Sequence, residues 1–232
     1  MATVTRMAIE GSALLPLLAW LSPSYPVGGY AYSHGLEWAA ESGEVTDEAN
    51  LAAWLSDFLH FGAGRNDGIL FAHAHRAAAA GDADALAAAN ELALALAPSS
   101  ELHLETSQQG TSFVAATRAA WPAPAIGQLA PAGAVAYPVA VGLAAGAHDL
   151  PLGPALEGFL FALVQNLVSA AIRLGVVGQT GGIRVAAALA PAIATVSAEA
   201  RNLTLDEVGG STFRADLGSF LHETQYSRLF RS

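Results

Sequence analysis

The fold is decided by the stretch PALEGFLFALVQNLVSAAIRLGVVGQTGG, which runs from Pro154 to Gly182. Its leucines recur at steps of three and four residues, which places them on one face of a helix. Phenylalanine, valine and alanine fill most of the remaining circumference. A helix that is apolar on nearly every side belongs in the centre of a large core or in a bilayer. We predict a central helix over about 154–177, ended by the GQTGG loop at 178–182.

One narrow strip of this helix is polar. Asn166, Ser169 and Arg173 are spaced three and four residues apart, so they share a face. A buried polar group without a partner costs about 1–3 kcal/mol, so a buried strip must find hydrogen bonds or water. Two interpretations stay open: a network satisfied inside the core, or a polar seam that leads to a partner surface at the glycine loop.

The composition is that of an acidic, apolar chain. Of 232 residues, 53% are hydrophobic and 13% are charged, and the mean hydropathy is +0.40. The net charge is −10 and the chain contains arginine but no lysine, which argues against a nucleic-acid or anionic-membrane partner. Because there is no cysteine, disulfides, thiolate metal sites and thiol catalysis are excluded.

Two apolar stretches, 129–148 and 155–174, have the length of a membrane span. The first is interrupted by prolines and glycines, and the second contains Arg173, which costs about 2.5–3.5 kcal/mol within a span. The N-terminal apolar run is broken by Pro16 and lacks a convincing cleavage site, which argues against a signal peptide. We expect a cytoplasmic protein without a membrane span, with a flexible segment at 1–11.

The rest of the chain predicts further helices and no sheet. The candidate N-caps that precede helices are Thr46, Asp67, Asp82 and either Ser99 or Ser100. Helices are also predicted over 12–22, 33–43, 138–148 and 182–202, and 121–134 is interpreted as a packed loop. No alternating run suggests a strand. The sequence predicts an all-α, single-domain bundle (1–232) of about 8–10 helices around the central one.

No catalytic or metal-binding constellation is visible. His73 and His75 are two residues apart, so on a helix they point to different faces and cannot share a metal ion. Glu101 and Glu105 share a helix face that is expected to be solvated. The GQTGG loop lacks the lysine of a phosphate loop and, at the end of a helix, offers carbonyls. The sequence therefore favours a binding protein without metal or cofactor.

Five segments carry motifs that occur in the same order in one known family. SPSYPVGGYAYSHGLE lies at 22–37 and ETSQQGTSF at 105–113. YPVAVGLAAGAHDLP follows at 137–151, NLVSAAIRLGVVGQTGG at 166–182 and HETQYSRLFRS at 222–232. These segments resemble the UreF family of urease accessory proteins, whose signature S-P-x-x-P-V-G-x-[FY]-x-Y-S-x-G-L-E is matched at each fixed position. The loop at 175–182 lacks that family's usual proline and aspartate.

The resemblance implies an all-helical, homodimeric scaffold without catalysis of its own. Such proteins link UreD, also called UreH, to the GTPase UreG for GTP-dependent delivery of nickel to apo-urease. The implied UreD-side residues are Tyr30, Tyr32, Glu223, Tyr226, Arg228, Leu229, Phe230 and Arg231. The implied UreG-side residues are Arg173, Gln179, Thr180 and Arg184. The strip of Asn166, Ser169 and Arg173 becomes a candidate wall of a polar passage, and the tail at 222–232 is expected to be mobile until UreD binds.

Two other functions stay open. A direct nickel carrier would use the histidines, which are His73, His75, His103 and His222. A factor that stimulates the GTPase UreG would need an exposed arginine beside the Gln179 loop, and Arg184 is available.

Overall fold

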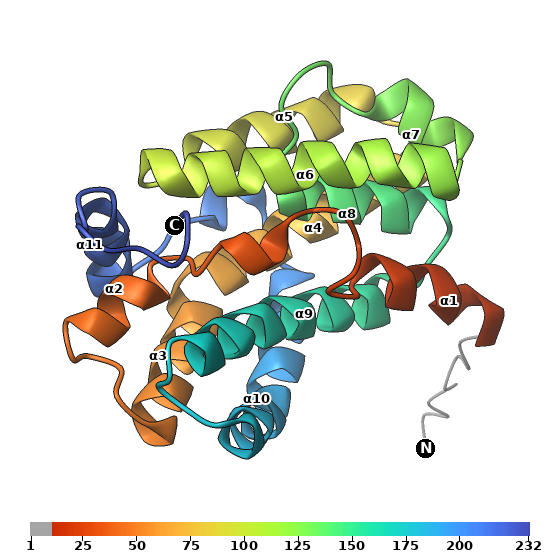
Figure 1. Cartoon of the computed structure of the whole chain (residues 1–232). Coiled ribbons are helices and arrows are strands. Elements are labelled where there is room, and N and C mark those ends of the chain that lie inside the picture. The colour runs from red at the N-terminus through yellow and green to blue at the C-terminus, as the bar shows by residue number, and fades with distance from the viewer. Residues whose placement is uncertain (1–10) are drawn as a thin grey trace.

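A computed structural model of the chain describes residues 11–232, with side chains described from residue 14 onward. The described part consists of helices and contains no strand, which confirms the all-α prediction (Figure 1). The predicted flexible segment at 1–11 lies, but for its final residue, outside the described residues. The α-helices are α1 Gly11–Trp20, α2 Leu36–Glu41, α3 Glu48–Phe61, α4 Ala63–Ala80, α5 Ala83–Ala95, α6 Ser100–Ala120, α7 Pro124–Leu129, α8 Tyr137–Ala147, α9 Leu152–Arg173, α10 Gln179–Ala200 and α11 Phe213–His222, and the 3-10 turns are η1 Gly29–Ala31 and η2 Leu205–Glu207.

Side-chain caps fix where several helices begin. Asp47, Asp82 and Ser99 each accept a hydrogen bond from the backbone N–H three residues further on. The caps predicted at Asp82 and Ser99 are therefore confirmed, whereas the one predicted at Thr46 is wrong by one residue. The helix expected from Ser33 begins only at Leu36.

The cap predicted at Asp67 is wrong, because Asp67 lies in the second turn of α4. Gly62 and Gly64 precede Asp67, and glycines so close together are typical of a loop. Gly64 instead lies in the first turn of α4, where a Cβ atom would be 2.9 Å from the Cα of Leu59. A close approach between helices, rather than a turn, explains this glycine.

The central helix α9 ends earlier than predicted. It stops at Arg173, and Gly175 follows in the left-handed conformation, with a φ of +76°, that commonly terminates a helix. Gly178 is the N-cap of α10, so GQTGG begins a new helix instead of ending α9. The expectation that this sequence offers carbonyls is therefore wrong, since the start of a helix offers free N–H groups.

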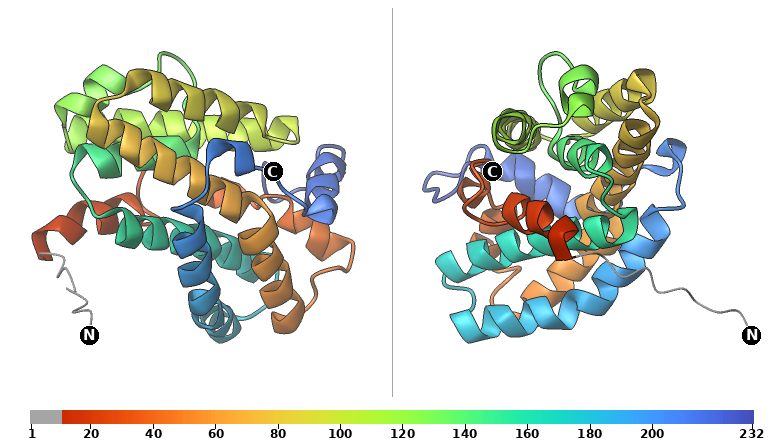
Figure 2. Two further views of the ribbon diagram at one scale, coloured as in Figure 1. Left: turned by 180° about the vertical axis from the view of Figure 1, so that it is seen from behind. Right: turned by 90° about the vertical axis from the view of Figure 1, so that its right-hand side faces the viewer.

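Buried side chains from Leu17 to Phe230 form one contiguous apolar core. Figure 1 shows α5, α6 and α7 above, α4 and α8 beneath them, and α9, α10 and α3 below. The view from behind in Figure 2 shows α4 crossing between the upper and lower helices. The position of α4 is consistent with its packing against α8, α5, α3, α10 and α9.

α4 and α8 pack closely because α8 carries glycine at two positions one turn apart. A Cβ atom at Gly142 would lie 2.5 Å from the carbonyl oxygen of Phe71, and one at Gly146 would lie 2.3 Å from that of His75. Any larger side chain would therefore push the two backbones apart.

We expect Gly146→Ala to lower the free energy of unfolding by about 1–3 kcal/mol, the usual cost of overpacking a buried site. Gly127→Ala is the matched control, because nothing lies within 4 Å of a Cβ at this exposed position of α7. That change should be neutral or stabilise by up to about 1 kcal/mol. Denaturant unfolding measures both, and equal stability of the two variants would contradict the close packing of α4 on α8.

α9 and α10 have the length and hydropathy of membrane-crossing helices. Their apolar windows are, however, 50% and 44% buried inside the chain, as expected for core helices. These two helices therefore do not indicate a membrane protein.

Candidate functional site

The tail at 222–232 is folded onto its own chain, so the prediction that it is mobile is wrong. Phe230 is only 4% exposed and belongs to the core. The backbone N–H of Arg231 donates to the carbonyl oxygen of Ala31 at 2.9 Å, and that of Ser33 donates to the carbonyl oxygen of Ser232 at 3.0 Å. The sequence reasoning missed these partners because they lie near the other end of the chain.

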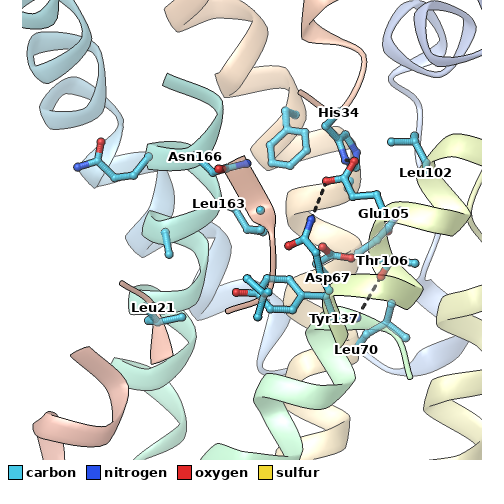
Figure 3. A pocket seen from close by; sticks show the side chains of 18 of the residues that line it. Leu21, His34, Asp67, Leu70, Leu102, Glu105, Thr106, Tyr137, Leu163 and Asn166 are labelled. Carbon is cyan, nitrogen blue, oxygen red and sulfur yellow. Dashed lines mark hydrogen bonds and ion pairs between the residues drawn. The ribbon is translucent and has the colours of Figure 1, made fainter. Parts of the chain in front are cut away.

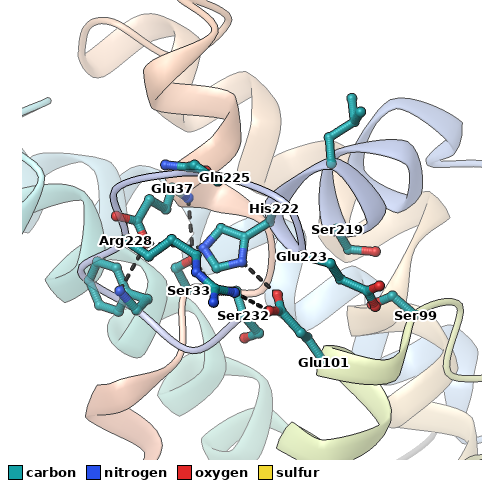
Figure 4. A network of polar contacts seen from close by, with 12 residues as sticks. Ser33, Glu37, Ser99, Glu101, Ser219, His222, Glu223, Gln225, Arg228 and Ser232 are labelled. Carbon is teal, nitrogen blue, oxygen red and sulfur yellow. Dashed lines mark hydrogen bonds and ion pairs between the residues drawn. The ribbon is translucent and has the colours of Figure 1, made fainter.

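Glu37 of α2 is the carboxylate that holds the tail (Figure 4). It is 5% exposed and accepts hydrogen bonds from the backbone N–H groups of Leu229 at 2.6 Å and Phe230 at 2.9 Å. A third partner is the ring of His222, whose Nε2 lies 3.1 Å from Oε2 of Glu37. Hydrogen bonds to an ionised acceptor are stronger than neutral ones, so this residue ties the tail firmly to α2.

His222 is fully buried between two carboxylates. Its Nδ1 lies 2.6 Å from Oε2 of Glu101, on the side opposite to Glu37. Both ring nitrogens of His222 therefore face a carboxylate oxygen. Arg228 donates to the other oxygen of Glu101. The expectation that Glu101 lies on a solvated face is therefore wrong, and the cluster is a structural clamp.

The same face of α6 also contacts the tail through Glu105, which likewise is not on a solvated face. Its carboxylate accepts a hydrogen bond from Oγ of Ser232 at 2.6 Å and lies 3.5 Å from Nδ1 of His34. Burial by itself lowers the pKa of His34, but the carboxylate of Glu105 acts in the opposite direction, and on balance the pKa of His34 is raised. The tail is thus in contact with α2, α6 and the segment before α2.

The predicted UreD-side residues divide into an exposed and a buried group. Tyr226 is wholly exposed, Leu229 is 61% exposed and Tyr30 is 70% exposed. Arg228 and Arg231 are also exposed. The buried group contains Phe230 and Tyr32, and Glu223 is half-buried.

Tyr32 and Glu223 make hydrogen bonds within the chain. The hydroxyl of Tyr32 donates to Oε1 of Gln108 at 2.6 Å, and Glu223 accepts from the N–H and hydroxyl of Ser100. α11 adds further exposed apolar side chains, which are Phe213, Leu217, Phe220 and Leu221. We call the exposed Tyr226 and Leu229, together with these four, the tail surface.

Arg173 contacts residues that were assigned to the UreD side. Its guanidinium carbon lies 4.3 Å from the centroid of the Phe230 ring, and Nη1 donates to the carbonyl oxygen of Tyr30. Arg173 and Ser169 are exposed and Asn166 is half-buried. The interpretation of the strip as a network satisfied inside the core is therefore wrong.

The other predicted UreG-side residues lie at the start of α10. Gln179 and Thr180 are exposed in its first turn. Arg184 follows and makes a two-pronged pair with Glu48 of α3, with Nε 3.0 Å from Oε2. This hydrogen-bonded pair lowers the pKa of Glu48. We call Gln179, Thr180 and Arg184 the α10 surface.

The histidines named for a nickel carrier have separate partners. Nε2 of His73 lies 3.0 Å from the carbonyl oxygen of Leu203, and Nε2 of His75 lies 2.7 Å from that of Leu150. Within residues 14–232, no group of three ligating side chains is arranged to hold a metal ion. His73 and His75 therefore fasten α4 to two different segments, in agreement with their prediction on different faces.

A cavity of about 580 Å³ was not predicted from the sequence (Figure 3). Asn166 and Ser169 of the polar strip line it, as do the titratable side chains of Asp67, Glu105 and Tyr137. These residues come from four helices without a common spacing in the sequence. The sequence signal for it was the polar strip with Asn166 and Ser169 in the otherwise apolar helix α9.

Comparison with known proteins agrees with the five motifs. The family model described as UreF matches residues 45–190. The urease accessory protein UreF of Xanthobacter autotrophicus is 65% identical over 222 residues, which cover 95% of this chain and 91% of that protein. Its counterpart in a Methylobacterium species is 64% identical, covering 94% and 88%, and that in a Rhodopseudomonas palustris strain is 51% identical, covering 97% and 93%. The chain therefore belongs to the UreF family of urease accessory proteins.

Proposed function

We propose that this chain is a cytoplasmic, non-catalytic scaffold that binds UreD, also called UreH, and the GTPase UreG at separate surfaces. In this role it supports the GTP-dependent delivery of nickel to apo-urease. The observation that carries the proposal is that exposed residues of two family motifs, at 166–182 and 222–232, lie on different helices of one packed core. A scaffold needs such rigidly connected surfaces.

The tail surface is the proposed site for UreD. Tyr226 and Leu229 project from a segment whose backbone is fixed by Glu37, so little conformational entropy is lost when they are buried. Exposed aromatic and arginine side chains are enriched in interface centres, and Tyr226 lies two residues from Arg228. Exposed Tyr30 extends this site, and Arg173 positions it through Phe230.

The α10 surface is the proposed site for UreG. Gln179 and Thr180 offer side-chain donors and acceptors next to the free N–H groups of the first helical turn. Ile183, which is 70% exposed, adds an apolar contact beside them. We also propose a homodimer, for which exposed apolar side chains outside both surfaces are available, and a water-lined passage along Asn166 and Ser169.

The two alternatives have less support. A nickel carrier has no converging histidines within the described residues. Arg184 is exposed but already paired with Glu48, so a role in stimulating UreG would require that pair to open.

We expect two double variants to separate the surfaces. Tyr226→Ala with Leu229→Ala should weaken UreD binding at least 30-fold, corresponding to a loss of about 2 kcal/mol. Gln179→Ala with Arg184→Ala should retain UreD and lose UreG from the preformed complex with UreD. Co-purification with tagged UreD and UreG, followed by mass on a sizing column, measures both effects.

The control is Leu15→Ala in α1, which truncates another exposed leucine without touching either surface. Truncated side chains are exposed in both double variants, so melting temperatures should stay close to that of the parent. Retention of UreD by the tail variant, or its loss from the α10 variant, would contradict the assignment.

A further inference from the structure

The cavity of about 580 Å³ has an apolar side and an acidic side (Figure 3). Leu21 and Leu163 face it from the direction of α9, and His34, Asp67 and Glu105 gather opposite to them. Its lining includes Leu18 and Phe161, which are 66% and 40% exposed, so solvent reaches it at the α1–α9 side. This volume lies within the range typical of small-molecule sites, about 300–1,000 Å³.

Two carboxyl groups on the acidic side have no hydrogen-bond partner within residues 14–232, although both act on the pKa of His34. Glu105 lies beside His34 and is bonded to Gln109 and Ser232. By contrast, the side chains of Asp67 on α4 and Asp216 on α11 accept no hydrogen bond from any residue between 14 and 232. Both line the cavity.

The titratable groups that line this space are Tyr30 of η1, His34 before α2, Asp67 on α4, Glu105 on α6, Tyr137 on α8 and Asp216 on α11. Burial raises the pKa of Asp67 to about 7 and also raises that of Asp216. An ionised carboxylate held in a partly desolvated place without a partner costs stability. Perturbed groups of this kind in a cavity are characteristic of binding sites.

The chemistry of the lining selects the occupant. An anion is disfavoured, because three carboxyl groups face the space, and His34, the one basic side chain among the lining residues, is paired with Glu105. A directly coordinated metal ion is disfavoured, since no three ligating side chains of the described residues converge. A charged head with an apolar stem matches both sides of the cavity.

We propose that this cavity binds an amphipathic organic cation, a primary ammonium or guanidinium group on a short alkyl chain. The head lies at the carboxylate of Asp67, and the stem lies against Leu21 and Leu163. This chemistry occurs in free alkylamines and in the lysine or arginine side chain of another protein. The inference is independent of the scaffold role, because it concerns the isolated chain.

Calorimetric titration of the isolated protein with hexylammonium tests the proposal. We expect saturable binding at pH 7.5, and at least tenfold weaker binding of hexan-1-ol, which has the same stem without the charge. Asp67→Asn should weaken hexylammonium binding at least tenfold, and Asp216→Asn should weaken it less. Asp57→Asn, which changes an exposed aspartate of α3, is the matched control and should bind like the parent.

The pH dependence gives a second readout. A cation favours ionised Asp67, so binding releases a proton where that group is protonated in the free protein. Affinity should therefore rise between pH 6 and pH 8, and this rise should disappear in Asp67→Asn. Nα-acetyl-lysine amide distinguishes the source: binding of this compound as well indicates a protein side chain, and binding of hexylammonium alone indicates a free amine.

Three results would overturn the proposal. The first is equal binding of hexan-1-ol and hexylammonium, and the second is unchanged affinity in a folded Asp67→Asn protein. The third is the absence of hexylammonium binding at millimolar concentration. If Ni²⁺ binds instead and Asp67→Asn removes that binding, the site is a metal site and the proposal is equally wrong. A failure of partner binding by the tail or α10 variants would leave these titrations unaffected.

Discussion

Glu37→Ala should detach the tail and lower the free energy of unfolding by about 3–5 kcal/mol, because it removes the carboxylate that three groups of the tail contact, and each buried group left unpaired costs about 1–3 kcal/mol. The substitution leaves two buried N–H groups, those of Leu229 and Phe230, without an acceptor. It also leaves the ring of His222 with Glu101 as its only carboxylate partner among the described residues. Each of these losses acts on the same short segment, so its release should accompany the destabilisation.

Hydrogen exchange across 222–232 and denaturant unfolding measure the two effects. Glu44→Ala is the control, since Glu44 pairs with exposed Arg214 at 3.0 Å and such surface pairs contribute about 0–1 kcal/mol. Slow exchange of the tail in a folded Glu37→Ala protein would show that other contacts suffice to hold it.

Asp67→Asn is expected to have the opposite effect on stability and to raise the free energy of unfolding at pH 8. The pKa of Asp67 rises from 3.8 to about 7 on folding, because burial disfavours the ionised form. The folded chain therefore binds this proton more tightly than the unfolded chain does. The resulting penalty is absent below pH 3.8, grows as the pH rises towards 7 and is complete above it.

The difference between the pKa values of Asp67 in the unfolded and the folded chain corresponds to at most about 4 kcal/mol. Water in the cavity screens the charge, so we expect a penalty of about 1–3 kcal/mol. Asparagine removes the ionisable group at nearly constant size. The melting temperature of Asp67→Asn should exceed that of the parent by about 2–12 °C at pH 8, and the difference should shrink as the pH falls and nearly vanish at about pH 3. Equal melting curves at pH 8 would show that Asp67 is not desolvated.

Local signals in the sequence predicted most of the helices, but the interpretation of 121–134 as a loop is wrong, because α7 lies within it. Asp82 and Ser99 cap helices with neighbours three residues away, and the periodic leucines of α9 need no distant information. The boundary at Gln179 was missed because both Gly175 and the GQTGG glycines are typical helix stops. Only the left-handed conformation of Gly175 shows which of them ends α9.

The sites depended on information that a local pattern does not contain. The tail was predicted to be mobile because its own residues provide too few neighbours. Its acceptor Glu37 is 192 residues away from Leu229 in the sequence. The cavity likewise combines side chains of α4, α6, α8 and α11. The family motifs pointed to exposed residues such as Tyr226 without indicating that Phe230 is buried.

The contact between Ser33 and Ser232 spans 199 residues, which has a consequence for the order of events during translation. The segment at 22–37 leaves the ribosome early, but its hydrogen-bond partners in 222–232 are made far later. Closing so long a loop is entropically costly and slow. A nascent chain therefore exposes the carboxylate of Glu37 until the tail arrives, and the surface that we propose for UreD cannot form before then. Ribosome-bound fragments should thus be unable to recruit the partner prematurely.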